Sequence, residues 1–172
     1  MKSLRIARPV LFALLLLTAT FTLAQTAAQK SFDQLKSLTG AWEGKDAEGK
    51  PVSVSFRDTA GGSALMSEIH GHGPENMVSM IHLDGPNRLM LTHYCGAGNQ
   101  PRMVSSASPD GKTFAFDFVD GTNIASPEDG HMQRVVITVL DANHHTEDWT
   151  FKDHDKQMKQ FFDLRRSELA QK

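Results

Sequence analysis

The chemically richest stretch of the chain runs from Arg88 to Arg102. It begins as an apolar strand and then places His93, Tyr94 and Cys95 in succession, and the chain has no other tyrosine or cysteine. Imidazole, phenol and thiol groups can donate or accept protons, act as nucleophiles or ligate metals. Such a concentration at the end of a strand predicts one wall and the rim of a binding cavity.

Alternation along the strand decides which of these groups face the cavity. Leu89, Leu91, His93 and Cys95 fall on one apolar face, and Tyr94 falls on the other. His93 and Cys95 are then ~7 Å apart between Cα atoms and could meet at a common ligand. A histidine at the end of an apolar wall is partly desolvated, which predicts a lowered pKa and a neutral ring near pH 7.

Three uses of this stretch stay open. His93 and Cys95 could contact a small-molecule ligand, or His93 could be the axial ligand of a haem or metal. Alternatively, His93, Tyr94 and Cys95 could form an enzyme or redox site, with Asn99 as a candidate orienting group. We expect Asn99, Gln100 and Arg102 at the rim, brought there by a flexible glycine-rich turn.

The preceding hairpin predicts a further histidine on the inner face. A four-residue turn over 84–87 pairs Leu83 with Arg88, and this register turns Val78, Met80 and His82 inward. His82 then lies roughly 13 Å from His93, which is too far for both to ligate one metal. His82 is therefore predicted as a separate ligand contact.

The following hairpin predicts an aromatic wall. Its inner face carries Phe114, Phe116 and Phe118 together with Met103 and Ser105. On its outer face we expect a cross-strand ion pair between Arg102 and Asp117.

A last hairpin supplies the remaining candidates. A three-residue turn over 141–143 puts Val135, Ile137 and Val139 on one face with His145, Glu147, Trp149 and Phe151, and His131 and Gln133 continue that face. A four-residue turn would instead reverse the first strand. We take His131, Glu147 and Trp149 as candidate ligand contacts, because a buried carboxylate needs a partner or a raised pKa.

Short strands joined mainly by hairpins must position all of these groups. A helix is expected over 31–38, capped by Ser31. Ten strands are expected over 40–45, 52–57, 64–71, 76–83, 88–95, 101–107, 112–119, 131–140, 145–152 and 157–166. A meander of this length removes its edges by closing on itself, which predicts an all-β, closed up-and-down antiparallel barrel.

The first 24 residues read as a cleaved signal peptide. A basic leader precedes an apolar run over 10–17, and small residues follow up to Ala24. Cleavage is expected after Ala24, with Ala28 as the second choice and a short membrane anchor as the alternative. Export would place the protein in the periplasm or outside the cell. Residues 25–30 are predicted as a disordered linker and residues 31–168 as the barrel domain.

The net charge of the chain argues against one class of partner, and its cysteine content excludes internal disulfides. Removing the leader takes away three of 18 basic residues and leaves 15 against 20 acidic ones. An acidic domain argues against nucleic acid as a partner. The lone Cys95 allows no internal disulfide, and no later run is long and apolar enough to cross a membrane. The pattern identifies no cofactor.

A resemblance adds to this reading. The helix followed by Gly40-Ala41-Trp42 resembles the Gly-x-Trp opening of the lipocalin and calycin barrels, and Arg166 matches the late arginine that packs across that tryptophan. The resemblance implies a cation–π contact between Trp42 and Arg166 that closes the barrel floor. Residues 83–85, 92–95 and 99–102 are similar to secreted bacterial lipocalin-like proteins of unknown function. The strand count is similar to that of nitrobindin-type haem barrels. The implied partner is a small apolar or amphipathic molecule.

Overall fold

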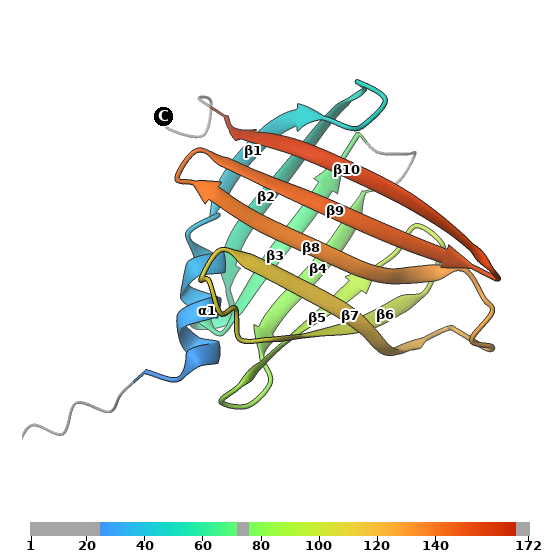
Figure 1. The fold of residues 1–172 in the computed structure, drawn as a ribbon, viewed down its shortest axis with the longest axis horizontal. Helices are drawn as coiled ribbons and strands as arrows, with labels where there is room; N and C mark the ends of the chain where they lie inside the picture. Colours follow the sequence, from blue (N-terminus) through green and yellow to red (C-terminus); the bar gives the residue numbers. More distant parts are fainter. Residues whose placement is uncertain (1–24, 72–75, 168–172) are drawn as a thin grey trace, which may run out of the picture.

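Within residues 25–71 and 76–167, which the computed structural model describes, ten antiparallel strands form a closed barrel (Figure 1). The elements are α1 (Ala27–Lys36), β1 (Gly40–Lys45), β2 (Pro51–Thr59), a 3-10 turn (Ala60–Gly62), β3 (Ala64–His70), β4 (Met77–Leu83), β5 (Arg88–Tyr94), β6 (Gln100–Ser106), β7 (Thr113–Thr122), β8 (His131–Asp141), β9 (His144–Asp153) and β10 (Lys156–Arg166). Consecutive strands pair, and β1 also pairs with β10. The predicted up-and-down barrel is confirmed.

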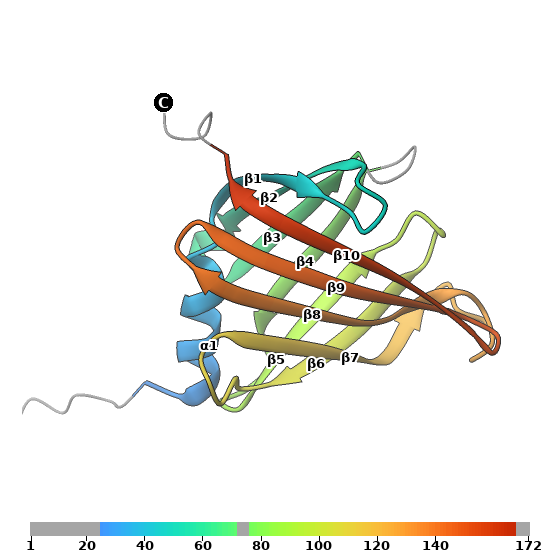
Figure 2. The same cartoon turned by 45° about the horizontal axis from the view of Figure 1, so that its top comes forward.

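The helix α1 lies across one end of the barrel, at the left in Figures 1 and 2. Its Phe32 and Leu35 are buried in the core. Within the described ranges, no helix has the length and hydropathy needed to cross a bilayer. The β5–β6 and β9–β10 turns lie at the end of the barrel away from α1.

The helix begins four residues earlier than predicted. Thr26 is its N-cap, and the Thr26 Oγ1 atom accepts a hydrogen bond from the Gln29 amide at 3.1 Å. Residues 27–30 are therefore helical, and their assignment to a disordered linker is wrong. The buried Ser31 instead accepts a hydrogen bond from the Ser108 amide at 2.9 Å. Ala28 extends the buried face by one turn and is fully buried. The predicted signal peptide lies outside the described residues.

The seam between the first and last strands joins the residues that the resemblance singled out. Trp42 and Arg166 are Cα partners, and the Arg166 guanidinium carbon lies 4.2 Å from the centroid of the Trp42 ring. The Trp42 indole donates to the Leu38 carbonyl at 2.7 Å. Arg166 donates to the carbonyls of Ser37, Thr39 and Ala142 at 2.8–3.0 Å. This seam closes the barrel next to α1, as expected.

The register of β4 against β5 differs from the prediction by one residue. Leu83 pairs with Leu89, and Ser79 pairs with His93. The turn holds five residues, closed by a hydrogen bond from the Asp84 amide to the Arg88 carbonyl at 2.9 Å. One extra residue reverses the parity of β4. The predicted inward orientation of Val78, Met80 and His82 is therefore wrong, and the buried side chains of β4 are Ser79 and Ile81.

A bulge changes the partner of Arg102. The register shifts between Arg102 and Met103, so Arg102 pairs with Asp120 rather than Asp117. The Arg102 Nε and Asp120 Oδ1 atoms are 2.5 Å apart, and Asp117 forms its ion pair with Arg134. The predicted Arg102–Asp117 pair is wrong: Asp117 pairs with Val104, so the register between β6 and β7 differs from the prediction by two residues, and the bulge on β7 adds a third.

The predicted inner faces of the other two hairpins are confirmed except at His131 and Gln133, where a register shift turns Met132 inward instead. Phe114, Phe116, Met103 and Ser105 are buried, and Phe118 packs against the core. Inward-facing side chains of β8 and β9 are Val135, Ile137, Val139, His145, Glu147 and Trp149. Their hairpin has a two-residue turn with a register shift next to it, which preserves the parity expected from a three-residue turn. A second shift beside Met132 leaves Gln133 unpaired on β8.

Candidate functional site

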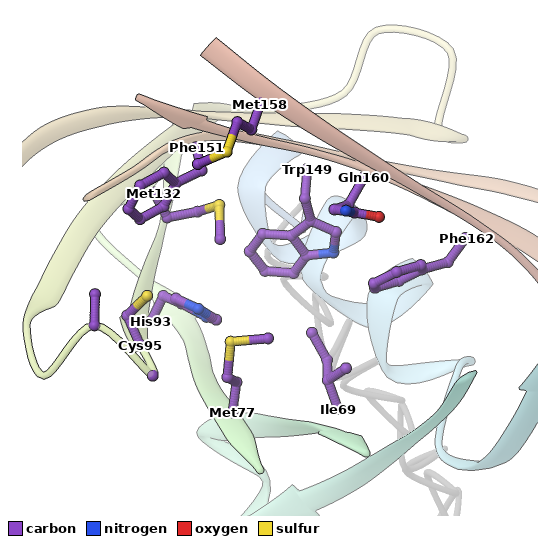
Figure 3. Close-up of a pocket in the computed structure, with 12 residues that line it drawn as sticks. Ile69, Met77, His93, Cys95, Met132, Trp149, Phe151, Met158, Gln160 and Phe162 are labelled. Carbon is purple, nitrogen blue, oxygen red and sulfur yellow. The ribbon is translucent and has the colours of Figure 1, made fainter. Parts of the chain in front are cut away.

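A pocket of about 350 Å³ lies at the end of the barrel opposite α1 (Figure 3). Its walls come from β3, β4, β5, β8, β9, β10 and the β5–β6 turn. They are built by Ile69, Met77, His93, Cys95, Gly96, Ala97, Met132, Trp149, Phe151, Met158, Gln160 and Phe162. Most of these side chains are aromatic or carry a thioether, and none is Asp, Glu, Lys or Arg. The size and lining are those of a small-molecule site.

His93 is the main polar group of this pocket. Its Nδ1 atom lies 2.9 Å from the Ser79 hydroxyl on β4, and its ring centroid lies 4.9 Å from that of Trp149. The side chain is fully buried, and burial lowers the pKa of the imidazole from 6.5 to about 4. The ring is neutral at pH 7. The predicted inward orientation and lowered pKa of His93 are confirmed.

The other imidazole nitrogen of His93 has no partner. Within the described part of the chain, the Nε2 atom is buried and makes no hydrogen bond. Because Nδ1 is held against β4, Nε2 is the end of the ring that faces the interior of the barrel (Figure 3). A buried polar atom without a partner costs roughly 1–3 kcal/mol, so a ligand that pairs with it gains that contribution.

Cys95 shares the pocket with His93, but Tyr94 does not. Cys95 is half-buried at the end of β5, and burial raises the pKa of its thiol. The thiol is therefore protonated at neutral pH and is a weak nucleophile. Tyr94 points outward and is 49% exposed, as predicted. The three consecutive residues do not converge on one point.

Beneath the pocket, a buried carboxylate fixes the indole of Trp149. The Trp149 Nε1 atom donates to Glu147 Oε2 at 2.8 Å, and His145 Nε2 lies 3.2 Å from Glu147 Oε1. Glu147 and His145 are fully buried, and the His145 ring meets the edge of Trp42 at 4.3 Å between centroids. Glu147 therefore has the partners that its burial requires. It positions a pocket wall and does not itself line the pocket.

The predicted rim residues bond to other parts of the chain. Asn99 is buried and donates to the Gly130 carbonyl at 2.7 Å. Gln100 accepts from the Thr122 hydroxyl at 2.5 Å, and Arg102 pairs with Asp120 on the outer face. None of these three residues lines the pocket. The tight turn after Cys95 is closed by backbone hydrogen bonds, and its Gly96 and Ala97 line the pocket.

The two other predicted histidines also lie away from the pocket. His82 faces outward, with its Nδ1 atom 2.9 Å from the Leu83 carbonyl. His131 is buried against Phe118 at 4.2 Å between centroids, and its Nδ1 atom lies 2.6 Å from the Asp129 carbonyl. Of the nine predicted contacts, the pocket brings together His93, Cys95 and Trp149. In the described ranges, no three His, Cys, Asp or Glu side chains cluster as a metal site.

Sequence reasoning missed several lining residues. Met158 and Gln160 share the parity of the buried Phe162, so alternation along β10 could have found them. Met132 escapes such reasoning because the register shift beside it reverses its orientation. Met77 was not considered as a pocket residue, although it lies at the pocket end of β4.

Comparisons with known proteins support the fold. No family model and no curated protein matches the chain. The crystal structure of Rv2717c from M. tuberculosis is similar, with a TM-score of 0.55 and 13% identity, covering 80% of this chain and 97% of that one. A redesigned beta barrel aligns with a TM-score of 0.40 and 12% identity, covering 85% of this chain and 98% of that one. The chain thus shares a barrel fold with Rv2717c.

Proposed function

We propose that this protein binds a small, largely apolar molecule in the pocket around His93. The observation that carries the proposal is the buried His93 Nε2 atom, which has no partner within the described part of the chain and faces a largely apolar cavity. Apolar walls supply affinity, and one polar atom orients the ligand. The methionines at the wall are flexible enough to adapt to ligand shape.

We also propose that the protein is exported and is a lipocalin-like barrel. The basic, apolar and small-residue order of residues 1–24 supports cleavage and transport to the periplasm or the cell exterior. The Gly40-Ala41-Trp42 opening and the contact between Trp42 and Arg166 support the likeness to the lipocalin and calycin barrels. An exported binding protein with this architecture suits transport or capture of an apolar compound.

Saturation-transfer NMR with naphthalene tests whether the pocket takes apolar molecules. Naphthalene has no polar head, so its binding reports only on the cavity. We expect transfer in the wild type and its loss in Met132→Trp, which fills the pocket. Met90→Trp, on the outward face of β5, is the matched control and should keep the transfer. Met77→Trp replaces Met132→Trp if that variant does not fold. Absence of transfer in the wild type contradicts the proposal.

A second candidate function is binding of a haem or another metal-containing ligand through His93. One observation favours it: the His93 Nε2 atom, which has no partner within the described residues, faces the pocket, and a ring nitrogen is the atom through which histidine ligates a metal. The absorption spectrum of the purified protein separates the candidates. A Soret band identifies haem, whereas native mass spectrometry of the same sample identifies an organic ligand by its mass.

A further inference from the structure

We propose that the pocket selects an uncharged ligand whose polar head is a hydrogen-bond acceptor, such as a ketone, ester or amide. This inference rests on the proposed binding function and names the ligand class. It follows from three features of the site: the proton position on His93, the absence of charge in the lining, and the size of the cavity.

The proton position follows from the Ser79 hydroxyl. Ser79 is buried, and within the described residues its hydroxyl has one hydrogen-bond partner, His93 Nδ1. A hydroxyl carries one hydrogen, and leaving that hydrogen buried without an acceptor is costly. The hydroxyl therefore donates to Nδ1, which must be the unprotonated nitrogen of the neutral ring. The proton of the imidazole then sits on Nε2, so that the pocket presents a donor.

The two candidate functions require opposite tautomers. A metal needs the lone pair of His93 Nε2, so Nδ1 must carry the proton and donate to Ser79. That arrangement leaves the serine hydrogen without an acceptor in the described part of the chain. The serine thus favours a ligand that accepts a hydrogen bond over one that binds through a metal.

The lining offers nothing to balance an ionised head group. Its side chains include no carboxylate, lysine or arginine, and His93 is neutral because it is buried. The Cys95 thiol is protonated for the same reason. An ionised group in an apolar site is strongly penalised unless it is paired. A carboxylate or ammonium head beside His93 would be unpaired, so both charge signs are disfavoured.

The cavity has room for a small ligand. Its volume of about 350 Å³ is in the range of small-molecule sites. A nine-carbon chain with a small head fits this space. The buried Gln160 Oε1 atom, which has no partner within the described ranges, offers a second polar contact to a head that also donates.

Calorimetric titration at pH 7.5 with 2-nonanone, nonanoate and nonylamine tests the selection. The three compounds each contain nine carbons in an unbranched chain and differ in charge. We expect 2-nonanone to bind at least tenfold more tightly than either charged compound, since an unpaired charge is costly to bury. Equal affinities, or a preference for a charged compound, overturn the inference while naphthalene binding leaves the proposed function intact. Loss of naphthalene binding as well contradicts both.

Replacing His93, which supplies the hydrogen-bond donor, can be compared with replacing a histidine outside the pocket. His93→Leu removes the Nε2 donor and should weaken 2-nonanone binding roughly five- to tenfold. His82→Leu changes a histidine on the outward face of the adjacent strand and should keep the wild-type affinity. An unchanged affinity in His93→Leu overturns the inference.

The tautomer can be read directly in the free protein by ¹⁵N NMR of the imidazole. We expect a proton-bearing Nε2 and a bare Nδ1 at His93. Ser79→Ala should weaken both this preference and 2-nonanone binding. Ser67→Ala, at the residue paired with Ser79 on β3, should change neither. A protonated Nδ1 in the wild type contradicts the proposal and favours a metal-containing ligand.

Discussion

The guanidinium of Arg166 stacks on the ring of Trp42, with 4.2 Å between the guanidinium carbon and the ring centroid, across the seam where the last strand meets the first. The same guanidinium donates to three backbone carbonyls, at Ser37, Thr39 and Ala142. One side chain thus joins β10, the segment after α1 and the β8–β9 turn.

Replacing this arginine should loosen the closure. Arg166→Ala removes the cation–π contact and the three hydrogen bonds, so we expect a loss of ~1–2 kcal/mol or more and a drop in melting temperature of roughly 3–8 °C. Arg165→Ala, at the exposed neighbouring position, is the matched control. Thermal unfolding followed by circular dichroism gives the melting temperature of both variants. An unchanged melting temperature in Arg166→Ala would show that Arg166 does not stabilise the closure of the barrel.

A glycine on the same seam should tolerate no side chain. A Cβ atom added at Gly44 would lie 1.8 Å from the Asp163 carbonyl oxygen, so the paired backbones must move apart. We expect Gly44→Ala to cost ~1–3 kcal/mol in the free energy of unfolding. Gly96→Ala is the control, because a Cβ there meets no atom within 4 Å. Urea denaturation of the two variants compares them, and equal stability contradicts the close approach.

The buried imidazole predicts how stability depends on pH. Burial lowers the pKa of His93 to about 4 in the folded state, against 6.5 for the free side chain. Between these values the unfolded chain binds a proton that the folded chain does not, so stability falls as pH falls. Across that window the loss from His93 is on the order of 3 kcal/mol.

This pH effect should disappear in His93→Leu. The quantity to compare is the difference in unfolding free energy between wild type and variant. The carboxylates contribute equally to both proteins, so their effect cancels in this difference. We expect that difference to change steeply between pH 6.5 and 4 and to be flat above pH 7. Identical pH slopes for the two proteins would show that His93 titrates as an exposed histidine does.

Removing the carboxylate beneath the pocket should release Trp149. Glu147→Ala leaves the Trp149 indole N–H and the His145 Nε2 atom without their buried partner, at a cost of ~1–3 kcal/mol for each unpaired group. Glu147→Gln keeps one acceptor and should cost less. Near-ultraviolet circular dichroism reports the Trp149 environment, and chemical denaturation gives the free energy. A Glu147→Ala spectrum identical to that of the wild type contradicts this positioning role.

The start of α1 favours one of the two cleavage positions. Cleavage after Ala24 keeps Thr26, whose side chain caps the helix, and the fully buried Ala28. Cleavage after Ala28 removes both and costs ~1 kcal/mol for the cap alone. We therefore expect the intact mass of the exported protein to begin at Gln25. Retention of Met1 in a membrane fraction contradicts export by cleavage.

Most of the fold followed from alternation, and most errors came from turns and bulges. Alternation within β5 oriented His93 and Tyr94 correctly, because burial of one face fixes a strand's rotation. It could not fix β4, since one extra residue in the turn between Leu83 and Leu89 reverses that strand. Arg102 was assigned the wrong partner because the register after the β6–β7 turn differs by two residues and a bulge on β7 adds one more.

The site was harder to predict than the fold. His93, Cys95 and Trp149 were found because they lie on strands with clear periodicity. Asn99 and Gln100 were misplaced because a polar side chain near a turn can bond to the chain as readily as to a ligand. The sequence offers no local signal that separates these two uses.

The helix α1 has a kinetic consequence for whatever the barrel holds. The Ala28 amide donates to the Pro86 carbonyl at 3.3 Å and Ser31 bonds to Ser108, so the helix is fastened to two strand turns at its end of the barrel. The proposed ligand would therefore enter and leave at the opposite end of the barrel, where the pocket lies, and its exchange would not require α1 to move.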